Sequence, residues 1–457
     1  IKQVGEDQKD ELIDQFASST LEGLVVTEGS LSFDEEQGIA HVDVSGIRTT
    51  AWSRQGSRKR QDFADLPSQD VDFSPDRARP AWREIPVDTG APTLQVTELT
   101  VLLPEDEDGY LLRGRPELDM SYGTTHFVRS AQLEGQTLTV TERVEGLGGE
   151  VPSEAIAAEK GKAARISNSA IFLLAPGDAV RQWQLPMPAY EGRLKPYEEA
   201  YAKVIAREPD KAFGYTNRAL FRWRTANLEG ALADYDKALE LDPAAETYRS
   251  RGSVLFAMDR FEDALPSYRQ AFEIDPSSAS ALGLAGALGR NGKVEEALAL
   301  LDEYDDYGTQ HPQFVDLRAE VLAYGGRAEE GLAAINELIE ERPGQGYLYN
   351  NSCWYRARFK VGTEGMIETC DKAVEQSSSA AAALDSRALA WLQLGEPAKA
   401  LADADAAINL APDQTSSRYF RAVAQQRLGD DSGKDFIAYM DRFWPGQARD
   451  FAFYGLK

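Results

Sequence analysis

The sequence predicts an α+β protein of more than one domain, with an antiparallel β-rich region first and an all-α array of helix pairs after it. Apolar residues alternate with a period of two over much of the first third. From about residue 196 onward, a similar segment recurs roughly every 33–35 residues. The chain has 457 residues, 42% of them hydrophobic, which is enough for cores in about two to four domains.

The composition excludes several classes of partner. The chain carries 75 acidic and 49 basic residues, a formal net charge of −26. Nucleic acids and anionic membrane surfaces require clustered Lys and Arg, so we expect no nucleic-acid partner. The apolar run at 170–175 is far below the roughly 20 residues that cross a bilayer, so we expect no membrane span.

Side chains suited to metal binding or nucleophilic catalysis are scarce. The chain has two cysteines and three histidines, and these are Cys353, Cys370, His41, His126 and His311. They show neither the spacing of a metal-ligand cluster nor that of a Cys/His or Ser/His catalytic unit. We therefore expect no catalytic residue, no metal site and no cofactor, and interpret His41 and His126 as structural.

The first part of the chain is expected to fold as a β-rich domain. Residues 1–20 form a short helical lead-in, and residues 21–178 an antiparallel, sandwich-like domain that ends in a helix at 150–166. Gly135 lies between two strand-like runs and can supply the positive φ of a hairpin turn. The expected strands are 24–27, 31–33, 39–45, 94–103, 126–133 and 137–144.

Two runs of charged residues in this domain could be binding sites or solvent-exposed turns. Arg54, Arg58, Lys59 and Arg60 could contact nucleic acid, but the acidity of the chain favours a solvated hairpin tip. The acidic run 105–108 lacks the ligand alternation of a calcium-binding loop, so a solvated turn is favoured.

Several ordered segments carry a family resemblance. These are 73–87, 103–110, 133–140 and 149–152. Together they resemble the β-rich region behind the catalytic core of bacterial transglutaminase-like proteins, over about residues 20–175. The resemblance implies a periplasmic location in the bacterial cell envelope, with the cytoplasm as the alternative. That family's Cys–His–Asp unit lies in an upstream core that no segment here matches, so no catalytic residue is carried over.

The chain begins at Ile1 with a polar stretch that has no signal-peptide pattern, and we expect it to be a piece of a longer protein. Residues 179–195 contain several prolines and are expected to form a linker between the two parts.

The second part is a repeat array over 196–435. The segments 231–243, 264–276 and 400–412 agree in spacing and residue type, and they resemble the tetratricopeptide repeat, a unit of two antiparallel helices. We expect six full repeats after a leading half-unit at 196–209, stacked into a solenoid.

Small residues mark where the paired helices approach each other. Gly331, Met366 and Trp354 depart from this pattern. The small residues are Ala219, Gly252, Ala285, Ala319, Ala388 and Ala422 in the first helices and Ala231, Ala264, Ala297 and Ala400 in the second.

A partner-binding groove is expected on the concave side of this solenoid, which the first helices line. Arginine forks bind carboxylates and aromatic rings supply contact area, so the groove would suit a protein or peptide of acidic character. The alternative is that these arginines cover helix surfaces or pair with neighbouring acids. The projected residues are Trp223, Arg224, Arg249, Arg290, Tyr324, Asn351, Tyr355, Arg358, Asp385 and Arg427.

Two further features belong to the array. Cys353 and Cys370 fall on the two helices of one repeat, where they could form a disulfide or remain two buried thiols. The aromatic segment 436–457 is expected to cap the last repeat, and the alternative is a tail that docks a partner.

These observations predict a non-catalytic scaffold for protein–protein interaction. The alternative is the substrate-recruiting C-terminal part of a transglutaminase-like or protease-like enzyme whose Cys–His–Asp core lies upstream. The oligomeric state is left open.

Overall fold

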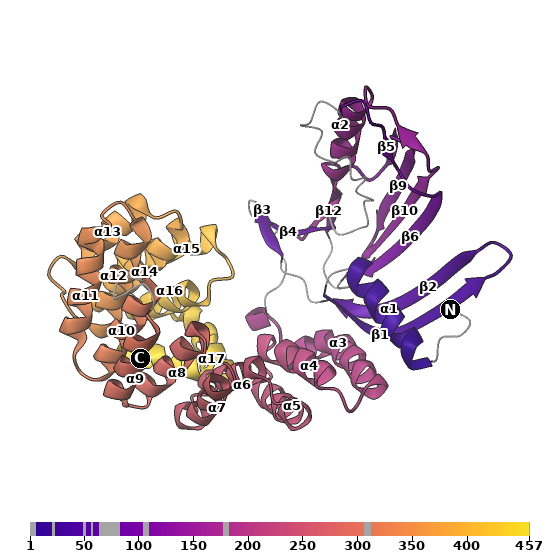
Figure 1. Cartoon of the computed structure of the whole chain (residues 1–457). Helices are drawn as coiled ribbons and strands as arrows, with labels where there is room; N and C mark the ends of the chain where they lie inside the picture. The colour runs from indigo at the N-terminus through magenta and orange to yellow at the C-terminus, as the bar shows by residue number, and fades with distance from the viewer. Residues whose placement is uncertain are drawn as a thin grey trace. The chain divides into compact units, whose positions relative to one another are not determined.

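The computed structural model of the chain is shown in Figure 1. It divides into two compact units, unit 1 at Ile1–Val204 and unit 2 at Ile205–Lys457. The acidic run 105–108, His311 and most of the segment 73–87 lie outside the described residues. The structure describes residues 6–20, 23–48, 52–55, 58–63, 83–103, 109–176, 182–305 and 312–456.

Unit 1 begins with a helix packed on a hairpin. Helix α1 (Glu6–Thr20) lies against strands β1 (Leu24–Asp34) and β2 (Ile39–Arg48), which pair antiparallel. Ile13 and Ala17 of the helix share a small core with Val26. Strand β1 is continuous where two short strands were expected, because a bulge after Val26 accommodates the polar residues without ending the pairing.

Two four-stranded antiparallel sheets follow, and both contribute to one core. Ala131, Leu138 and Val140 of the first sheet pack with Leu173 of the second and with Phe63. The first sheet has the order β6 (Thr93–Leu102), β10 (Thr137–Gly146), β9 (Thr125–Glu134) and β8 (Leu118–Tyr122). The second has the order β3 (Ser53–Gln55), β4 (Arg58–Asp62), β12 (Phe172–Leu174) and β7 (Leu111–Arg113). The expected antiparallel β-rich domain is confirmed.

Helix α2 (Ile156–Ser167) closes a second core with the first sheet. Its Ile156 and Ile166 pack with Phe127 and Val144. The helix starts later than expected, because residues before it form β11 (Glu150–Val151), which pairs with β5 (Val87–Asp88).

An ion pair lies inside unit 1. Nε of Arg129 on β9 donates to Oε1 of Glu142 on β10 over 2.6 Å, and its Nη1 donates to the Ser169 carbonyl oxygen over 2.7 Å. The two charged side chains are 7% and 1% exposed. Burial raises the pKa of Glu142, against the opposing effect of Arg129. Such a pair is tolerated inside a protein only because each charge compensates the other.

The predicted linker 179–195 is helical from Met187 onward. The 3₁₀ turn η2 (Gln182–Gln184) precedes α3 (Met187–Arg207), which contains Pro196. Pro188 lies in the first turn of this helix, where the missing N–H of proline has no intrahelical partner to lose. The proline content therefore indicated a linker where the chain forms a helix.

Unit 2 is a stack of antiparallel helix pairs (Figure 1), which confirms the repeat fold. The helices of the six repeats are α4 (Ala212–Arg224), α5 (Leu228–Leu241), α6 (Ala245–Ala257), α7 (Phe261–Ile274), α8 (Ser278–Arg290), α9 (Val294–Tyr304), α10 (Pro312–Tyr324), α11 (Ala328–Glu341), α12 (Gly346–Phe359), α13 (Met366–Gln376), α14 (Ala380–Gln393) and α15 (Pro397–Leu410). They are followed by α16 (Thr415–Arg427), the 3₁₀ turn η3 (Asp431–Gly433), α17 (Lys434–Phe443) and α18 (Pro445–Phe453). The small residues Ala219, Ala231 and Ala264 are fully buried, as close approach of paired helices requires.

One departure from the small-residue pattern has a clear packing reason. An added Cβ at Gly331 would overlap the Tyr355 hydroxyl and come within 2.9 Å of the Cα atom of Ala319. That hydroxyl lies 3.0 Å from the carbonyl oxygens of both Ala319 and Ala328. Gly331 therefore makes room for a buried tyrosine that links α12 to the preceding repeat.

Candidate partner-binding surface

The first helices of unit 2 are already covered by the C-terminal segment of the chain. We call the inner sides of α6, α8, α10, α12, α14 and α16 the concave surface. The segment from Trp444 to Leu456, which contains α18, touches each of these six helices. The contacts are Gly446 on α6, Asp450 on Arg290 of α8, Phe453 on Tyr324 of α10, Tyr454 on Trp354 of α12, the Tyr454 carbonyl on Gln393 of α14, and Phe451 on Tyr419 of α16.

The fit of α18 against α6 is close. An added Cβ at Gly446 would overlap the carbonyl oxygen of Phe256. Nearby, Arg449 pairs with Asp259 over 2.9 Å. The C-terminal segment thus covers the last repeat, as expected of a cap, and also runs back along the array to α6.

Arg290 anchors α18 to α8. Its guanidinium pairs with Asp450 and lies 4.4 Å from the ring centroid of Phe261 and 4.9 Å from that of Tyr324. Burial alone lowers the pKa of Arg290, but Tyr324 and Asp450 raise it above its ordinary value. The predicted groove residues Arg290 and Tyr324 therefore lie on the concave surface and bind the chain's own helix.

Arg358 has a similar role on α12. It is 8% exposed, and its Nη1 donates to Oε1 of Glu320 over 2.5 Å while its Nη2 donates to the Tyr324 hydroxyl over 3.1 Å. Its guanidinium also lies 5.3 Å from the ring centroid of Tyr454. This predicted residue is paired internally, as the alternative interpretation of the arginines had allowed.

A cavity of about 500 Å³ remains between α18 and the first helices. Of the predicted groove residues, Asn351, Tyr355, Arg358 and Asp385 line it. The other lining residues are Asp316, Glu320, Ile335, Asn350, Trp354, Ala382, Ser386 and Ser416 on the repeats and Gln447, Asp450, Phe451 and Tyr454 on the C-terminal segment.

Two carboxyl groups of this cavity differ from the rest. Asp316 accepts a hydrogen bond from Asn351 Nδ2 over 2.6 Å, and Asp385 accepts from Ser416 and Ser417 over 2.8 Å and 2.5 Å. Within the described ranges, neither forms an ion pair with Lys or Arg. Burial raises the pKa of Asp316 to about 7, with Glu320 adding to the shift, and burial raises that of Asp385 to about 6.

Asp316 was missed by the sequence analysis, although a signal for it exists. It lies 35 residues before Asn351, one repeat length away, and therefore at the equivalent position of the preceding first helix. Gln447 and Asp450 carry no such signal, because they come from the segment that folds back onto the repeats.

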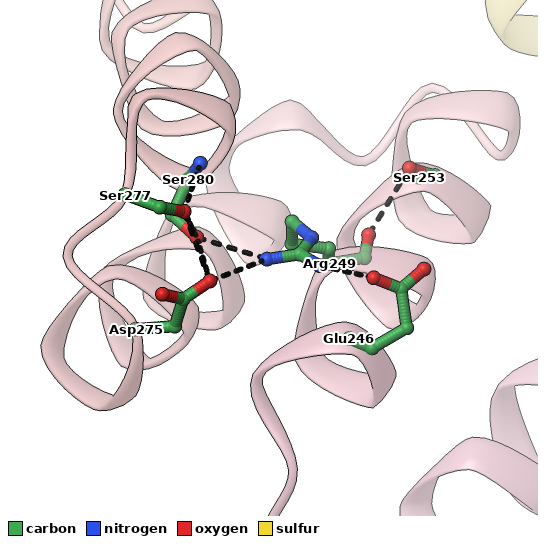
Figure 2. Close-up of polar contacts among 6 residues, drawn as sticks. All are labelled: Glu246, Arg249, Ser253, Asp275, Ser277 and Ser280. Carbon is green, nitrogen blue, oxygen red and sulfur yellow. Dashed lines mark hydrogen bonds and ion pairs between the residues drawn. The ribbon is translucent and has the colours of Figure 1, made fainter. Parts of the chain in front are cut away.

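Arg249 joins two repeats (Figure 2). It pairs with Glu246 on its own helix, its Nη1 donates to Ser280 Oγ over 2.9 Å, and it lies 3.4 Å from Asp275. Its side chain is 26% exposed. The network ties α6 to the start of α8, so the charge of Arg249 is largely compensated by neighbouring acids.

The remaining predicted groove residues are spread over the ends of the array. Trp223 is partly buried against the core of the first repeats, whereas Arg224 is exposed. Arg427 is exposed and donates to the carbonyl oxygens of Leu392 and Gly455. Tyr355, in the middle of the array, lines the cavity but is only 3% exposed. A partner-binding role for these residues stays a prediction.

Cys353 and Cys370 lie on α12 and α13 of the same repeat. The structure has a disulfide between them, with their Cα atoms 4.9 Å apart, in a fully buried setting. The bond joins the two helices in a core against which the cavity-lining Trp354 packs, and it links residues 17 positions apart.

The described part of the chain shows neither a metal-binding cluster nor a membrane-spanning helix. It holds no group of three or more His, Cys, Asp or Glu side chains placed to bind a metal ion. None of its helices combines the length and the apolar character needed to cross a bilayer.

Comparisons with known proteins bear on unit 2. Residues 214–244 and 255–321 match family models of the tetratricopeptide repeat. Among solved structures, a tetratricopeptide repeat protein from Parabacteroides merdae is 18% identical, with 52% of this chain and 94% of that chain covered and a TM-score of 0.42. YrrB, described as a TPR protein with an unusual peptide-binding site, is 27% identical (41% and 97% covered, TM-score 0.29), and yeast Tom70 is 15% identical (59% and 57% covered, TM-score 0.41).

A comparison with curated proteins gave no match. The two family matches lie within unit 2, so the transglutaminase-like resemblance of residues 20–175 stays a prediction. The chain contains tetratricopeptide repeats, as the spacing of its small residues predicted.

Proposed function

We propose that unit 2 is a scaffold for protein–protein interaction that binds a segment of a partner protein on the concave surface. One observation carries this proposal. Six consecutive first helices all contact the C-terminal segment 444–456, which contains α18 and is held by charged, aromatic and backbone contacts. A surface that accommodates one helix in this way has the anchors that a helix-in-groove interaction uses.

The cavity beside α18 supports the same proposal. Binding sites combine concave space with apolar walls and a few polar groups that fix orientation. Here Trp354, Phe451 and Tyr454 supply the apolar walls, and Asn351 and Ser416 supply polar groups. We place the centre of the binding surface at this cavity.

Selection from a random peptide library tests the proposal. The full chain is used as bait, and selected peptides are measured by fluorescence anisotropy against two variants of α14. Ala382→Trp fills the cavity, whereas Ala380→Trp adds the same side chain at an exposed position outside it. We expect the first variant to weaken binding by at least about tenfold and the second to leave it unchanged. Equal affinity for both variants, or the absence of any binding peptide, would contradict the proposal.

A further inference from the structure

The carboxyl groups that line the cavity outnumber the cations there, and α18 adds no cation to it. Four carboxyl groups and one guanidinium line it. The carboxyl groups of Glu320 and Asp450 are paired with Arg358 and Arg290. Asp316 and Asp385 have only neutral hydrogen-bond donors among the described residues. From α18, the side chain that lines the cavity besides Asp450 and Phe451 is Gln447, which carries no charge.

The cavity is also incompletely filled. It is open to solvent, so there is room beside α18 for a longer side chain than that of Gln447.

A cationic side chain would answer both features. Lysine and arginine carry several N–H donors on a long apolar stem, which can fill space next to Trp354 while the charged end reaches carboxylates. Gln447 enters the cavity from α18, so the equivalent position of a docked helix is the place from which such a side chain would reach it.

We propose that the partner segment is a helix that replaces α18 on the concave surface and carries a lysine or arginine where α18 carries Gln447. This proposal rests on the proposed function and names the chemistry of the partner. The same helix would be acidic where Asp450 meets Arg290 and aromatic where Phe451 meets Tyr419. The partner would therefore carry a positive charge at the cavity, in addition to the acidic character expected from the arginines.

The pH at which the cation binds best follows from the groups that face the cavity. These are Asp316 and Glu320 on α10, Tyr355 and Arg358 on α12, Asp385 on α14, and Asp450 and Tyr454 on the C-terminal segment. The pKa values of Asp316 and Asp385 are raised to about 7 and about 6, so these two carboxyls are protonated at pH 5 and ionised at pH 8. A cation is attracted only by the ionised carboxylates, so the affinity of a cationic partner should rise between pH 5 and pH 8.

The first experiment uses the full chain and needs no partner. The substitution Gln447→Lys places a cation in the cavity, and hydrogen exchange of the amides of residues 446–453 reports how tightly α18 is docked. We expect exchange roughly tenfold slower than in the unsubstituted chain at pH 8, and little difference in protection at pH 5. Gln447→Glu should accelerate exchange at pH 8.

Two controls separate the cavity from a general effect of charge. Ala452→Lys adds the same charge to the same helix at a residue that does not line the cavity, and it should leave the protection unchanged. Combining Gln447→Lys with Asp316→Asn and Asp385→Asn should remove the gain. A gain equal to that of Ala452→Lys, or one that survives both Asn substitutions, would overturn the proposed cation site.

The second experiment tests binding in trans. The receptor is the full chain with Gly446→Val, which releases α18 because the added side chain overlaps the Phe256 carbonyl. The probes are fluorescein-labelled peptides of residues 444–456 with Gln, Lys or Met at position 447. We expect the Lys peptide to bind roughly tenfold more tightly than the other two at pH 8 and equally at pH 5.

The outcomes distinguish the two proposals. Equal binding of all three peptides at pH 8 would overturn the cationic partner and leave the concave surface as a helix-binding site. If hydrogen exchange shows that α18 is released but no peptide binds, the proposed function itself fails, because the surface would not accept a helix in trans.

Discussion

The two units of this protein bury charged groups in different ways. In unit 1, Glu142 meets Arg129 on the adjacent strand, and both are enclosed in the sheet. In unit 2, Asp316 and Asp385 are largely withdrawn from water and line a cavity, and neither forms an ion pair among the described residues. A buried charge costs several kcal/mol unless a partner compensates it. In unit 1 the compensating partner is Arg129. In unit 2 the charge of each carboxyl is avoided by protonation or would be compensated by a bound ligand.

The largest expected effect comes from removing one partner of the buried ion pair between Arg129 and Glu142. Arg129→Met removes the cation and leaves Glu142 buried among apolar side chains, which should destabilise unit 1 by about 3–5 kcal/mol. The measurement is hydrogen exchange by mass spectrometry, with peptides from β9 and β10 compared with peptides from α14 and α15.

A double substitution is the control for this prediction. Arg129→Met with Glu142→Leu replaces both charges by apolar groups of similar volume and should recover most of the lost stability. If the single substitution left the protection of β9 and β10 unchanged, the pair would not be the central contact of unit 1 that its burial indicates.

The second prediction concerns the covalent link in unit 2. Cys353 and Cys370 are 17 residues apart, and closing a loop of this length stabilises a fold by about 3 kcal/mol in the chain-entropy model. Reduction should therefore lower the free energy of unfolding of unit 2 by about this amount, as measured by urea titration of circular dichroism at 222 nm.

The matched control is the variant with both cysteines changed to Ala, which should be insensitive to reductant. A direct assay complements it: the denatured, unreduced chain should contain no titratable thiol. Two thiols in that assay would show that the cysteines are a pair of buried small residues, the alternative that the sequence had left open.

The third prediction concerns the pH dependence of stability that the cavity-lining carboxyl of Asp316 should produce. The raised pKa of Asp316, about 7, lets the folded chain hold this proton up to about pH 7, whereas an unfolded Asp releases it near its ordinary pKa of 3.8. The contribution to stability is therefore fully present below about pH 4 and is lost as the pH rises to about 7. Asp316→Asn keeps a neutral side chain at every pH and can still accept from Asn351.

We accordingly expect the Asp316→Asn variant to match the unsubstituted chain near pH 4 and to be more stable at pH 8. The gain should be on the order of 1–2 kcal/mol, less than the full pKa shift implies, because the cavity admits solvent. The measurement is urea unfolding at both pH values. A variant that is less stable at pH 8 would mean that the ionised carboxylate already has a compensating partner.

The sequence predicted the repeats better than it predicted the site. Ala219, Ala231 and Ala264 are buried where paired helices approach closely. Each repeat needs a small residue at these positions, so such residues recur in the sequence at a fixed spacing. The three-residue strands β3, β7 and β12 were not predicted, because they are too short to show alternation.

The candidate site depends on contacts that no local pattern encodes. Repeat register placed Asn351 and Asp385 on the concave surface, where the structure has them lining the cavity. The ion pair of Arg290 with Asp450 joins residues 160 positions apart, and that of Asp259 with Arg449 joins residues 190 apart. Periodicity describes neighbours in sequence, so it could not show that the C-terminal segment returns to α6 and covers the predicted groove.

The smallest expected effect is that of Gly161→Ala, which is best measured against a second helical glycine, Gly331 in unit 2. An added Cβ at Gly161 of α2 meets no atom within 4 Å, so Gly161→Ala should only reduce the entropy of the unfolded chain and stabilise unit 1 by about 0.5–1 kcal/mol. Gly331→Ala in α11 should instead cost about 1–3 kcal/mol, because the methyl group would displace the Tyr355 hydroxyl. Urea unfolding of both variants measures the difference. Opposite signs would show that unit 2 uses glycine for close packing whereas α2 does not, and equal signs would contradict the tight contact between α11 and Tyr355.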